Sequence, residues 1–210
     1  MIRILIADDH AVVRRGLKQI ITEEPDMAVI GEAQTGQEVL DLVRKQNWDV
    51  VVLDITMPGR SGLEVLTELK RQYPRLPVLV LSIHPEDQFA MRVLKAGASG
   101  YMTKESAPEE LVKAIRKVFK GGKYVSPSLA EKLAFNLEAD SEKPLHERLS
   151  DREYQVMCMI ASGKTLTDIA NELSLSVKTI STYRMRILEK MDMKNNVEIT
   201  RYCIRNHLVD

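Results

Sequence analysis

Short apolar runs rich in β-branched residues alternate with helical-period segments through the first 120 residues of the chain. Five such runs predict strands that are buried on both faces, and the segments between and after them predict helices. The expected strands are residues 2–7, 27–33, 50–54, 77–82 and 98–103, and the expected helices are residues 10–23, 35–46, 62–72, 85–96 and 108–119. Strand–helix units repeated in this way predict an α/β fold with a doubly wound, five-stranded parallel sheet of the flavodoxin-like kind.

The pattern changes in the last sixty residues, where helical periodicity continues without strand-like runs. Three helix starts are marked by capping residues. Ser150 opens a capping box with Glu153, the sequence "TLTD" at 165–168 approximates such a box, and Ser176 caps the next helix. The sequence "LSLS" at 173–176 separates two of these helices by a short turn. A small all-α domain of the helix-turn-helix kind is therefore expected.

The length of 210 residues is comfortable for two domains, each with its own core. The expected parts are a first domain at 1–120, a linker at 121–147 and a second domain at 148–210. Gly121 and Gly122 stop the last helix of the first domain, because glycine favours helix ends. The linker pattern allows a short helix over 128–137, and the polar residues 139–147 predict a tether.

Charge and composition add little to this picture. The formal charge is zero, although residues 178–205 contain seven Lys and Arg against three Asp and Glu. Cys158 and Cys203 lack metal-ligand spacing and predict small buried residues in a reducing compartment. No run approaches the roughly 20 apolar residues that span a bilayer, so a cytoplasmic protein without membrane contact is expected.

Chemically informative residues follow the predicted strands of the first domain. Asp8 and Asp9 follow the first strand, Asp54 ends the third, Ser82 ends the fourth, and Lys104 follows the fifth. Because the carboxyl ends of parallel strands share one edge of a sheet, we expect these side chains to converge. Clustered carboxylates repel one another unless a cation lies between them, and oxygen ligands of this kind suit Mg²⁺.

This combination favours phosphoryl transfer, in which positioning and charge neutralisation supply most of the catalysis. Asp54 would be the nucleophile and would form an acyl phosphate. Each carboxylate taken alone is better explained as a helix cap or a solvated strand end. Their joint occurrence with Ser82 and Lys104 favours a site.

The segments "ILIADDH", "VVLDITMPGRSG", "LSIH" and "KAGASGYMTK" resemble the receiver domain of bacterial two-component response regulators, with spacings similar to the NarL/FixJ type. The resemblance implies that Asp54 accepts a phosphoryl group from a sensor histidine kinase, so that the chain is a phosphoprotein. It further implies that Asp9, Asp54 and the backbone carbonyl of Thr56 hold Mg²⁺, while Asp8 acts through water.

The same resemblance implies a switch formed by Ser82, Tyr101 and Lys104. In the family the hydroxyl residue moves toward the phosphoryl group, the lysine pairs with it, and the aromatic residue turns inward. Such a switch is a local charge event that biases an element with two states. His10 is expected to begin the first helix and to line the site.

The helix expected at 176–191 has two faces. Ile180, Ile187 and Met191 recur at helical spacing and are expected to face inward. A second stripe is mostly polar and nearly free of acidic residues, as suits a helix that enters the major groove. The candidate DNA contacts are Lys178, Thr179, Ser181, Thr182, Arg184, Met185 and Arg186. The hydroxyl side chains would reach bases and the basic ones phosphates, although the stripe alone would equally fit a solvated helix face.

The sequence "LSDREYQVMCMIASGKTLTDIANELSLSVKTISTYRMRILEKM" resembles the LuxR-type helix-turn-helix. Within that family, "KYVSPSLAEKLA" and "KTISTYRMRILEKM" are most similar to the GacA/UvrY type. The resemblance implies a transcription factor whose receiver masks the recognition helix until phosphorylation. It also implies promoter DNA as a partner and a homodimer formed through the last helix, at about 195–206, and RNA polymerase is a further candidate partner.

Two other functions are compatible with parts of the sequence. Phosphatases of the haloacid-dehalogenase type also use a strand-end aspartate with Mg²⁺, but they carry a second aspartate two residues later, where this chain has Thr56. We therefore expect no enzyme activity beyond self-phosphorylation from donors and slow hydrolysis of the chain's own acyl phosphate. A regulator that acts through protein partners, or independently of phosphorylation, is the other alternative.

Overall fold

The computed structural model describes residues 1–83, 86–127, 129–131, 144–206 and 208–209. The chain divides into two compact units, Met1–Ala134 and Phe135–Asp210. Among the described helices, none combines the length and the apolar character that crossing a bilayer requires.

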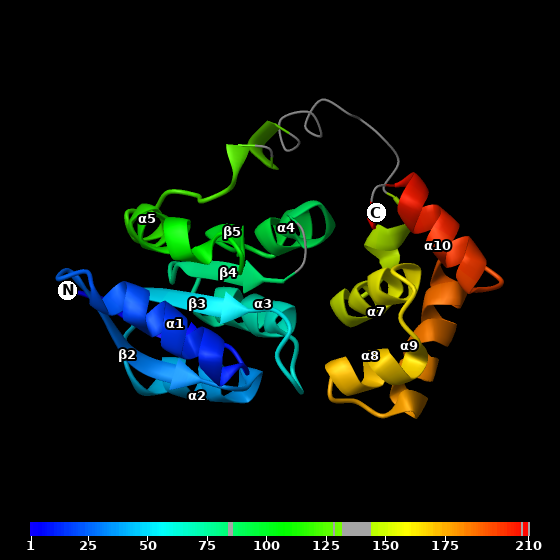
Figure 1. The fold of residues 1–210 in the computed structure, drawn as a ribbon, viewed down its shortest axis with the longest axis horizontal. Coiled ribbons are helices and arrows are strands. Elements are labelled where there is room, and N and C mark those ends of the chain that lie inside the picture. The colour runs from blue at the N-terminus through cyan, green and yellow to red at the C-terminus, as the bar shows by residue number, and fades with distance from the viewer. Residues whose placement is uncertain (84–85, 128, 132–143, 207, 210) are drawn as a thin grey trace. The chain divides into compact units, whose positions relative to one another are not determined.

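The first unit is an α/β layer structure whose strands and helices alternate along the chain (Figure 1). The strands are β1 (Ile2–Ala7), β2 (Met27–Ala33), β3 (Val50–Asp54), β4 (Val78–Ser82) and β5 (Gly100–Thr103). The helices are α1 (Ala11–Thr22), α2 (Gly36–Lys45), α3 (Gly62–Gln72), α4 (Glu86–Lys95) and α5 (Ala107–Phe119). All neighbouring strands pair in parallel in the order β2-β1-β3-β4-β5, which confirms the predicted doubly wound sheet.

Alternate strand residues fill a core on one face of the sheet, under α1 and α5. Ile4, Ile6 and Val52 pack with Leu111 and Ile115 in a single cluster of buried side chains. Burial of each such side chain contributes about 1.5–3 kcal/mol to folding. The alternation follows from the two-residue period of a strand. On the opposite face α2 packs against α3, and α4 packs against β5.

The second unit is helical within its described residues (Figure 1). Its elements are the 3₁₀ helix η1 (Leu145–Arg148), α7 (Asp151–Ala161), α8 (Leu166–Glu172), α9 (Val177–Lys190) and α10 (Asn196–Arg205). The predicted capping box of Ser150 and Glu153 is present at the start of α7. Thr165 and Asp168 complete a second capping box at the start of α8, where the sequence only approximated one, because an aspartate side chain also reaches back to the cap.

Several boundaries differ from the predicted ones. The fifth strand begins at Gly100 and not at residue 98, because Ala98 still belongs to the turn that closes α4 and donates its N–H to the Val93 carbonyl. Helix α1 begins at Ala11, with His10 as its N-cap. The short helix allowed over 128–137 lies mostly outside the described residues, although 129–131 are helical.

Candidate functional site

Two aspartates and a lysine meet at the carboxyl edge of the first unit's sheet. Asp8 follows β1, Asp54 ends β3 and Lys104 follows β5. Lys104 Nζ lies 2.6 Å from Asp8 Oδ2 and 2.8 Å from Asp54 Oδ2. The side chains of Asp8 and Asp54 are 1% and 0% exposed. The predicted convergence of these three residues is therefore present, and the lysine compensates two buried carboxylates that would otherwise be strongly unfavourable.

The electrostatics of Lys104 follow from this arrangement. Burial alone would lower the pKa of Lys104, but the neighbouring Asp54 and Asp8 outweigh burial and raise the pKa above its ordinary value. The lysine is therefore charged at neutral pH. It provides a fixed positive charge directly beside the Asp54 carboxylate.

Both oxygens of the Asp54 carboxylate have partners. Oδ1 accepts hydrogen bonds from the Thr56 backbone N–H at 2.9 Å and from the Thr56 hydroxyl at 2.6 Å, while Oδ2 faces Lys104. The chain behind Asp54 is held by close packing against Gly62. A Cβ at Gly62 would lie 2.2 Å from the Asp54 carbonyl oxygen and 2.5 Å from the Ile55 Cα, so that only glycine fits there.

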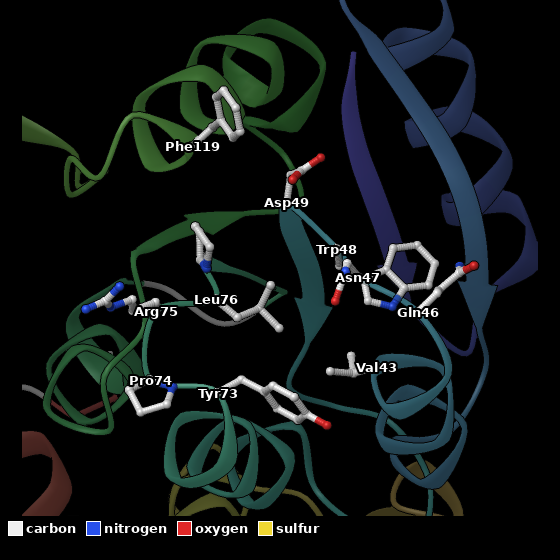
Figure 2. Close-up of a pocket in the computed structure, with 11 residues that line it drawn as sticks. Val43, Gln46, Asn47, Trp48, Asp49, Tyr73, Pro74, Arg75, Leu76 and Phe119 are labelled. Carbon is white, nitrogen blue, oxygen red and sulfur yellow. The ribbon is translucent and has the colours of Figure 1, made fainter.

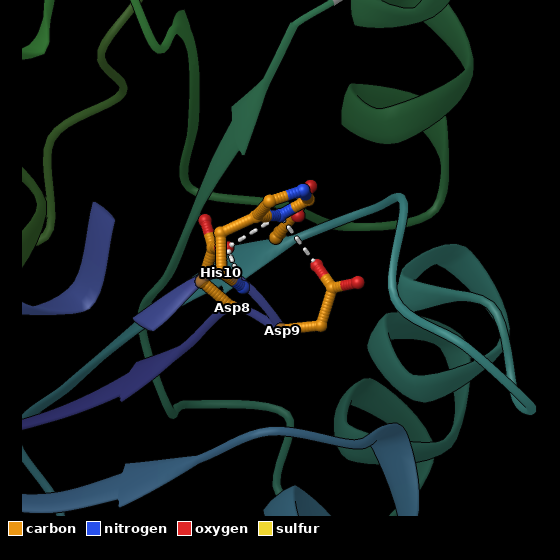
Figure 3. Close-up of side chains that lie close together, drawn as sticks. Asp8, Asp9 and His10 are labelled. Carbon is orange, nitrogen blue, oxygen red and sulfur yellow. Dashed lines mark hydrogen bonds and ion pairs between the residues drawn. The ribbon is translucent and has the colours of Figure 1, made fainter. Parts of the chain in front are cut away.

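Asp9 and His10 complete the acidic edge (Figure 3). His10 Nδ1 lies 2.8 Å from Asp9 Oδ1 and 3.3 Å from Asp8 Oδ1, and the His10 N–H donates to Asp8 Oδ1 at 2.8 Å. Asp8, Asp9, His10 and Asp54 each offer one ligand atom, and these atoms lie within 4.8 Å of one another. The predicted role of His10 as a residue that lines the site agrees with this geometry.

This cluster fits a hard divalent cation. Asp8 Oδ2 and Asp9 Oδ1 are shielded from solvent and face Lys104 Nζ at 2.6 Å and His10 Nδ1 at 2.8 Å, respectively. A carboxylate has about four lone-pair sites, so these contacts leave acceptor capacity for a cation. Carboxylate oxygens are the ligands that Mg²⁺ prefers. The cluster therefore contains the set of oxygen ligands that a bound Mg²⁺ would require.

Ser82 and Tyr101 lie next to each other beneath this edge. Both side chains are fully buried. Burial strongly raises the pKa of the Tyr101 hydroxyl, and a hydrogen bond with Ser82 partly offsets this increase. The aromatic ring of Tyr101 therefore lies inside the first unit.

Two residues that shape the site were not predicted. Arg14 on α1 is buried and donates from Nη1 to the Asp8 carbonyl at 2.7 Å, which fixes the chain just before Asp9. Arg14 lies at helical spacing from Leu17 and Ile21 on the buried stripe of α1, and this spacing could have predicted its burial. Gly62 carries no comparable signal, because a glycine that begins a helix has several ordinary explanations.

In the second unit, α9 presents a mostly polar exposed face. Of the predicted DNA contacts, Lys178, Thr182, Met185 and Arg186 are exposed. The opposite face is apolar and buried, as predicted: Ile180 and Ile187 are 0% exposed and Met191 1%. Lys190 Nζ, 2.6 Å from the buried Glu153 carboxylate, anchors the end of α9 to α7.

The remaining predicted DNA contacts are partly buried. Arg184 donates from Nε to Asn196 Oδ1 on α10 at 2.6 Å. The Thr179 hydroxyl lies 2.8 Å from the hydroxyl of Ser176, the helix cap. Ser181 is partly buried, whereas its neighbour Thr182 is exposed. Arg184 and Thr179 are held by contacts within the second unit, so Lys178, Thr182, Met185 and Arg186 are the more accessible part of α9.

A separate cavity of about 580 Å³ opens at the amino ends of β3 and β4, away from the acidic cluster (Figure 2). Trp48, Tyr73, Arg75 and Phe119 are among the side chains that line it. Trp48 packs inward and donates its indole N–H to the Leu42 carbonyl at 3.1 Å. The cavity lacks the convergent carboxylates that make the opposite edge a candidate site for phosphoryl chemistry.

Two family models match this chain and together account for most of its length. Residues 4–116 match the response regulator receiver domain, and residues 147–203 match the bacterial regulatory proteins of the luxR family. The chain belongs to the LuxR-type response regulators. As a member of this family, the regulator combines a receiver domain with a helix-turn-helix DNA-binding domain for transcription regulation, and a receiver domain implies a sensor histidine kinase as partner.

Similar proteins span the whole regulator. It is 40% identical over 211 residues to the response regulator GacA of Pseudomonas aeruginosa, with 100% of this chain and 99% of that relative covered. It is 36% identical over 209 residues to the response regulator UvrY of Escherichia coli K12, with 99% and 96% covered. These relatives confirm the resemblance to the GacA/UvrY type.

A solved structure of a similar regulator includes DNA. RcsB from Salmonella enterica serovar Typhimurium, bound to promoter rprA in the presence of the phosphomimetic BeF₃⁻, has a TM-score of 0.64 and 27% identity. The similarity covers 96% of the regulator and 98% of the RcsB chain.

Proposed function

We propose that a sensor histidine kinase phosphorylates Asp54, and that this modification controls binding of promoter DNA by the exposed face of α9. The observation that carries the proposal is the buried Asp54 carboxylate, which lies 2.8 Å from Lys104 Nζ and beside the acidic pair Asp8 and Asp9. This arrangement combines a nucleophile, a fixed positive charge and a set of oxygen ligands at one sheet edge.

In the transfer step a carboxylate oxygen of Asp54 attacks phosphorus, and the bond from phosphorus to the donor's histidine nitrogen breaks. The electron pair of that bond remains on the nitrogen, which takes up a proton, and Asp54 becomes an acyl phosphate. Lys104 is placed to exchange its contact with Asp54 Oδ2 for one with the new phosphoryl oxygens.

Asp8, Asp9, Asp54 and the backbone carbonyl of Thr56 are the residues that would hold Mg²⁺. When bound, this ion supplies the positive charge that reduces repulsion between the carboxylates and the incoming phosphoryl group. The convergence of carboxylate oxygens from Asp8, Asp9 and Asp54 supports this assignment.

Ser82, Tyr101 and Lys104 form the proposed switch. Ser82 ends β4, and its side chain is fully buried, as is that of Tyr101. Phosphorylation draws the Ser82 hydroxyl toward the phosphoryl group, and Tyr101 responds as its neighbour in the interior.

DNA binding and dimerisation are assigned to the second unit. Lys178 and Arg186 contact phosphates and Thr182 reads bases, with Thr179, Ser181, Arg184 and Met185 around them. Val197 and Ile204 on α10 are 67% and 52% exposed, which supports a homodimer formed through this helix. One solved structure of RcsB contains two dimers bound to two parallel DNAs. RNA polymerase is a further proposed partner, and the regulator acts in the cytoplasm.

The phosphatase alternative is weakened by Thr56. Its hydroxyl donates to Asp54 Oδ1 and cannot serve as the carboxylic acid that protonates a leaving group. We therefore propose that the regulator does not turn over external phosphoesters. Action through protein partners alone remains the second function, and the exposed apolar residues of α10 favour it as much as they favour a homodimer.

The test is incubation of the full chain with acetyl phosphate and Mg²⁺, followed by intact-mass measurement. The wild type should gain one phosphoryl group, Asp54→Ala should gain none, and Asp41→Ala on the surface of α2 should behave as the wild type. A phosphoryl group on Asp54→Ala, or repeated turnover of p-nitrophenyl phosphate by the wild type, would contradict the proposal.

A further inference from the structure

The first residues after α5 extend the sheet of the receiver. Gly100 and Tyr124 form a parallel bridge outside the named strands. The Tyr124 N–H donates to the Ser99 carbonyl at 2.9 Å, and the Tyr101 N–H donates to the Tyr124 carbonyl at 3.1 Å. Because β5 is the last strand in the order β2-β1-β3-β4-β5, residues 123–126, here called the linker strand, cover its free edge.

The sequence of β5 is adapted to this contact. A Cβ at Gly100 would lie 2.7 Å from the Tyr124 carbonyl oxygen and 2.8 Å from the Tyr124 Cβ. Contacts this short do not occur between real atoms, so that any larger residue at 100 would push the linker strand away. The close approach is therefore built into β5 and into the linker together.

Side chains of the linker strand reach the elements on both sides of β5. The Tyr124 hydroxyl donates to Glu110 Oε2 on α5 at 2.7 Å, and Lys117 Nζ lies 5.8 Å from the centre of the Tyr124 ring. The Ser126 hydroxyl donates to the Glu86 carboxylate at the start of α4. The linker strand thus joins α4, β5 and α5 by specific hydrogen bonds.

Tyr101 is the point where the linker strand meets the proposed switch. Its side chain is buried inside the receiver, and its backbone N–H donates to the Tyr124 carbonyl of the linker strand outside β5. A displacement of Tyr101 or of α4 must therefore alter the hydrogen bonds of residues 123–126. These residues lead directly into the chain that continues to the DNA-binding unit.

We infer that the linker strand transmits a change in the positions of Ser82 and Tyr101 to the rest of the linker. Tyr124 is the residue that positions the linker strand on β5. The inference rests on the proposed role of Asp54. The predicted linker at 121–147 accordingly does not begin as a free tether. Its first residues belong to the sheet, and signal transmission requires their pairing with β5.

The test measures amide hydrogen exchange at Tyr101 and Tyr124, and binding to pooled genomic DNA fragments, for the full chain with and without acetyl phosphate and Mg²⁺. In the wild type, phosphorylation should change exchange at Tyr124 by about fivefold or more. Gly100→Ala should raise exchange at both amides by about tenfold and reduce the phosphorylation-dependent gain in DNA affinity by about threefold or more, with phosphoryl uptake unchanged.

A second pair of variants tests the same inference if Gly100→Ala does not fold. Glu110→Gln weakens the contact with the Tyr124 hydroxyl and should reduce the gain in DNA affinity, whereas Glu109→Gln changes the same charge on the same helix without that contact. Equal effects of the two variants would overturn the inference. Unchanged exchange at Tyr124 in a phosphorylated chain that gains DNA affinity would also overturn it, while loss of phosphoryl uptake by the wild type would overturn the role of Asp54 instead.

Discussion

Asp54 lies at the end of a strand that is otherwise apolar, and its neighbours provide the charge and hydrogen bonds that a buried carboxylate requires. Lys104 faces one oxygen and Thr56 donates to the other. Arg14 and Gly62 fix the chain segments on which Asp8 and Asp54 lie. The reactivity of this single residue thus depends on its neighbour Thr56 and on residues from α1, α3 and the segment after β5.

Replacement of Lys104 by methionine should destabilise the regulator, because two buried carboxylates lose their positive partner. Lys104→Met keeps the side-chain volume but leaves Asp8 and Asp54 without a buried counter-charge, so that the free energy of unfolding should fall by about 3 kcal/mol in the absence of divalent cations. Addition of Mg²⁺ should restore more stability to this variant than to the wild type, because the ion supplies the missing positive charge. Urea unfolding with and without Mg²⁺ measures both effects.

Lys45→Met, at an exposed position in α2, is the matched control and should change the free energy of unfolding by less than about 0.5 kcal/mol. Equal stabilisation of Lys104→Met and of the wild type by Mg²⁺ would contradict the assignment of the cation to this cluster. Because the pKa of Lys104 is raised, the contribution of its ion pairs is complete at neutral pH and is lost only as the pH rises through the raised value.

Lys70 gives a second pH-dependent prediction. Burial, together with the nearby Lys123, lowers the pKa of Lys70 to about 8. The unfolded chain therefore binds more protons at this position between pH 8 and about 10.4, and folding stability rises with pH over that interval. The wild type should gain roughly 1–2 kcal/mol relative to Lys70→Met between pH 7 and pH 10. Urea unfolding at the two pH values measures the gain, and a constant difference between the two proteins would refute it.

At the scale of single residues, some positions of the site could be predicted from the sequence and others could not. Asp8, Asp54 and Lys104 could be predicted because each follows a strand, and parallel strands end at one edge. The burial of Arg14 could have been found from its register with Leu17 and Ile21, but the close approach of Gly62 to the Asp54 carbonyl depends on packing between elements. Such contacts are not encoded in local periodicity, so they could not be predicted.

Helix α9 combines a buried anchor with an exposed polar face. Lys190 is held by Glu153 of α7, and Ile180 and Ile187 fill the core of the second unit. Lys178 and Thr182 lie one turn apart on the exposed face, and the Thr182 hydroxyl donates to the Lys178 carbonyl at 3.0 Å. The two side chains can therefore be compared as neighbours with different expected roles.

Thr182→Ala should change sequence preference. The Thr182 hydroxyl and methyl group are exposed and suited to a base edge, so their loss should alter the binding free energy by about 1–3 kcal/mol at one base-pair position. Binding to a randomised DNA library, followed by sequencing of the bound fraction, measures this shift. Equal losses on all sequences would show that Thr182 does not read bases.

Lys178→Ala should weaken binding to every sequence to a similar extent. Its ammonium group is expected to contact a phosphate, and the slope of log affinity against log salt concentration should fall by about one. Titrations of one DNA fragment at several salt concentrations measure the slope. An unchanged slope would place Lys178 away from the phosphate backbone.

Most elements could be predicted, and the errors have local causes. The five strands and their parallel, doubly wound sheet followed from apolar runs and from the rules for parallel crossovers, while the strand order comes from the structure. The late start of β5 at Gly100 reflects the turn that closes α4, in which Gly97 has a φ of 99°. The apolar pattern across residues 98–103 did not contain this information, because a buried turn and a buried strand are both apolar.

The whole molecule consists of a phosphoacceptor unit and a DNA-binding unit joined by a chain whose first residues belong to the sheet. The two-unit organisation could be predicted from the change in periodicity. The pairing of the linker strand could not, since "KYVS" at 123–126 is too short to be distinguished from a loop by its pattern. Regulation by phosphorylation requires that both units respond together, so it must be tested on the full chain.

The most direct measurement is the affinity of the full chain for DNA at one fixed salt concentration, before and after acetyl phosphate and Mg²⁺. The wild type should bind genomic fragments about tenfold or more tightly after treatment, as a coupling of about 1.4 kcal/mol requires, and Asp54→Ala should not change. An equal gain by Asp54→Ala, or phosphorylation of Asp54 in the wild type without any gain, would contradict control of DNA binding through Asp54.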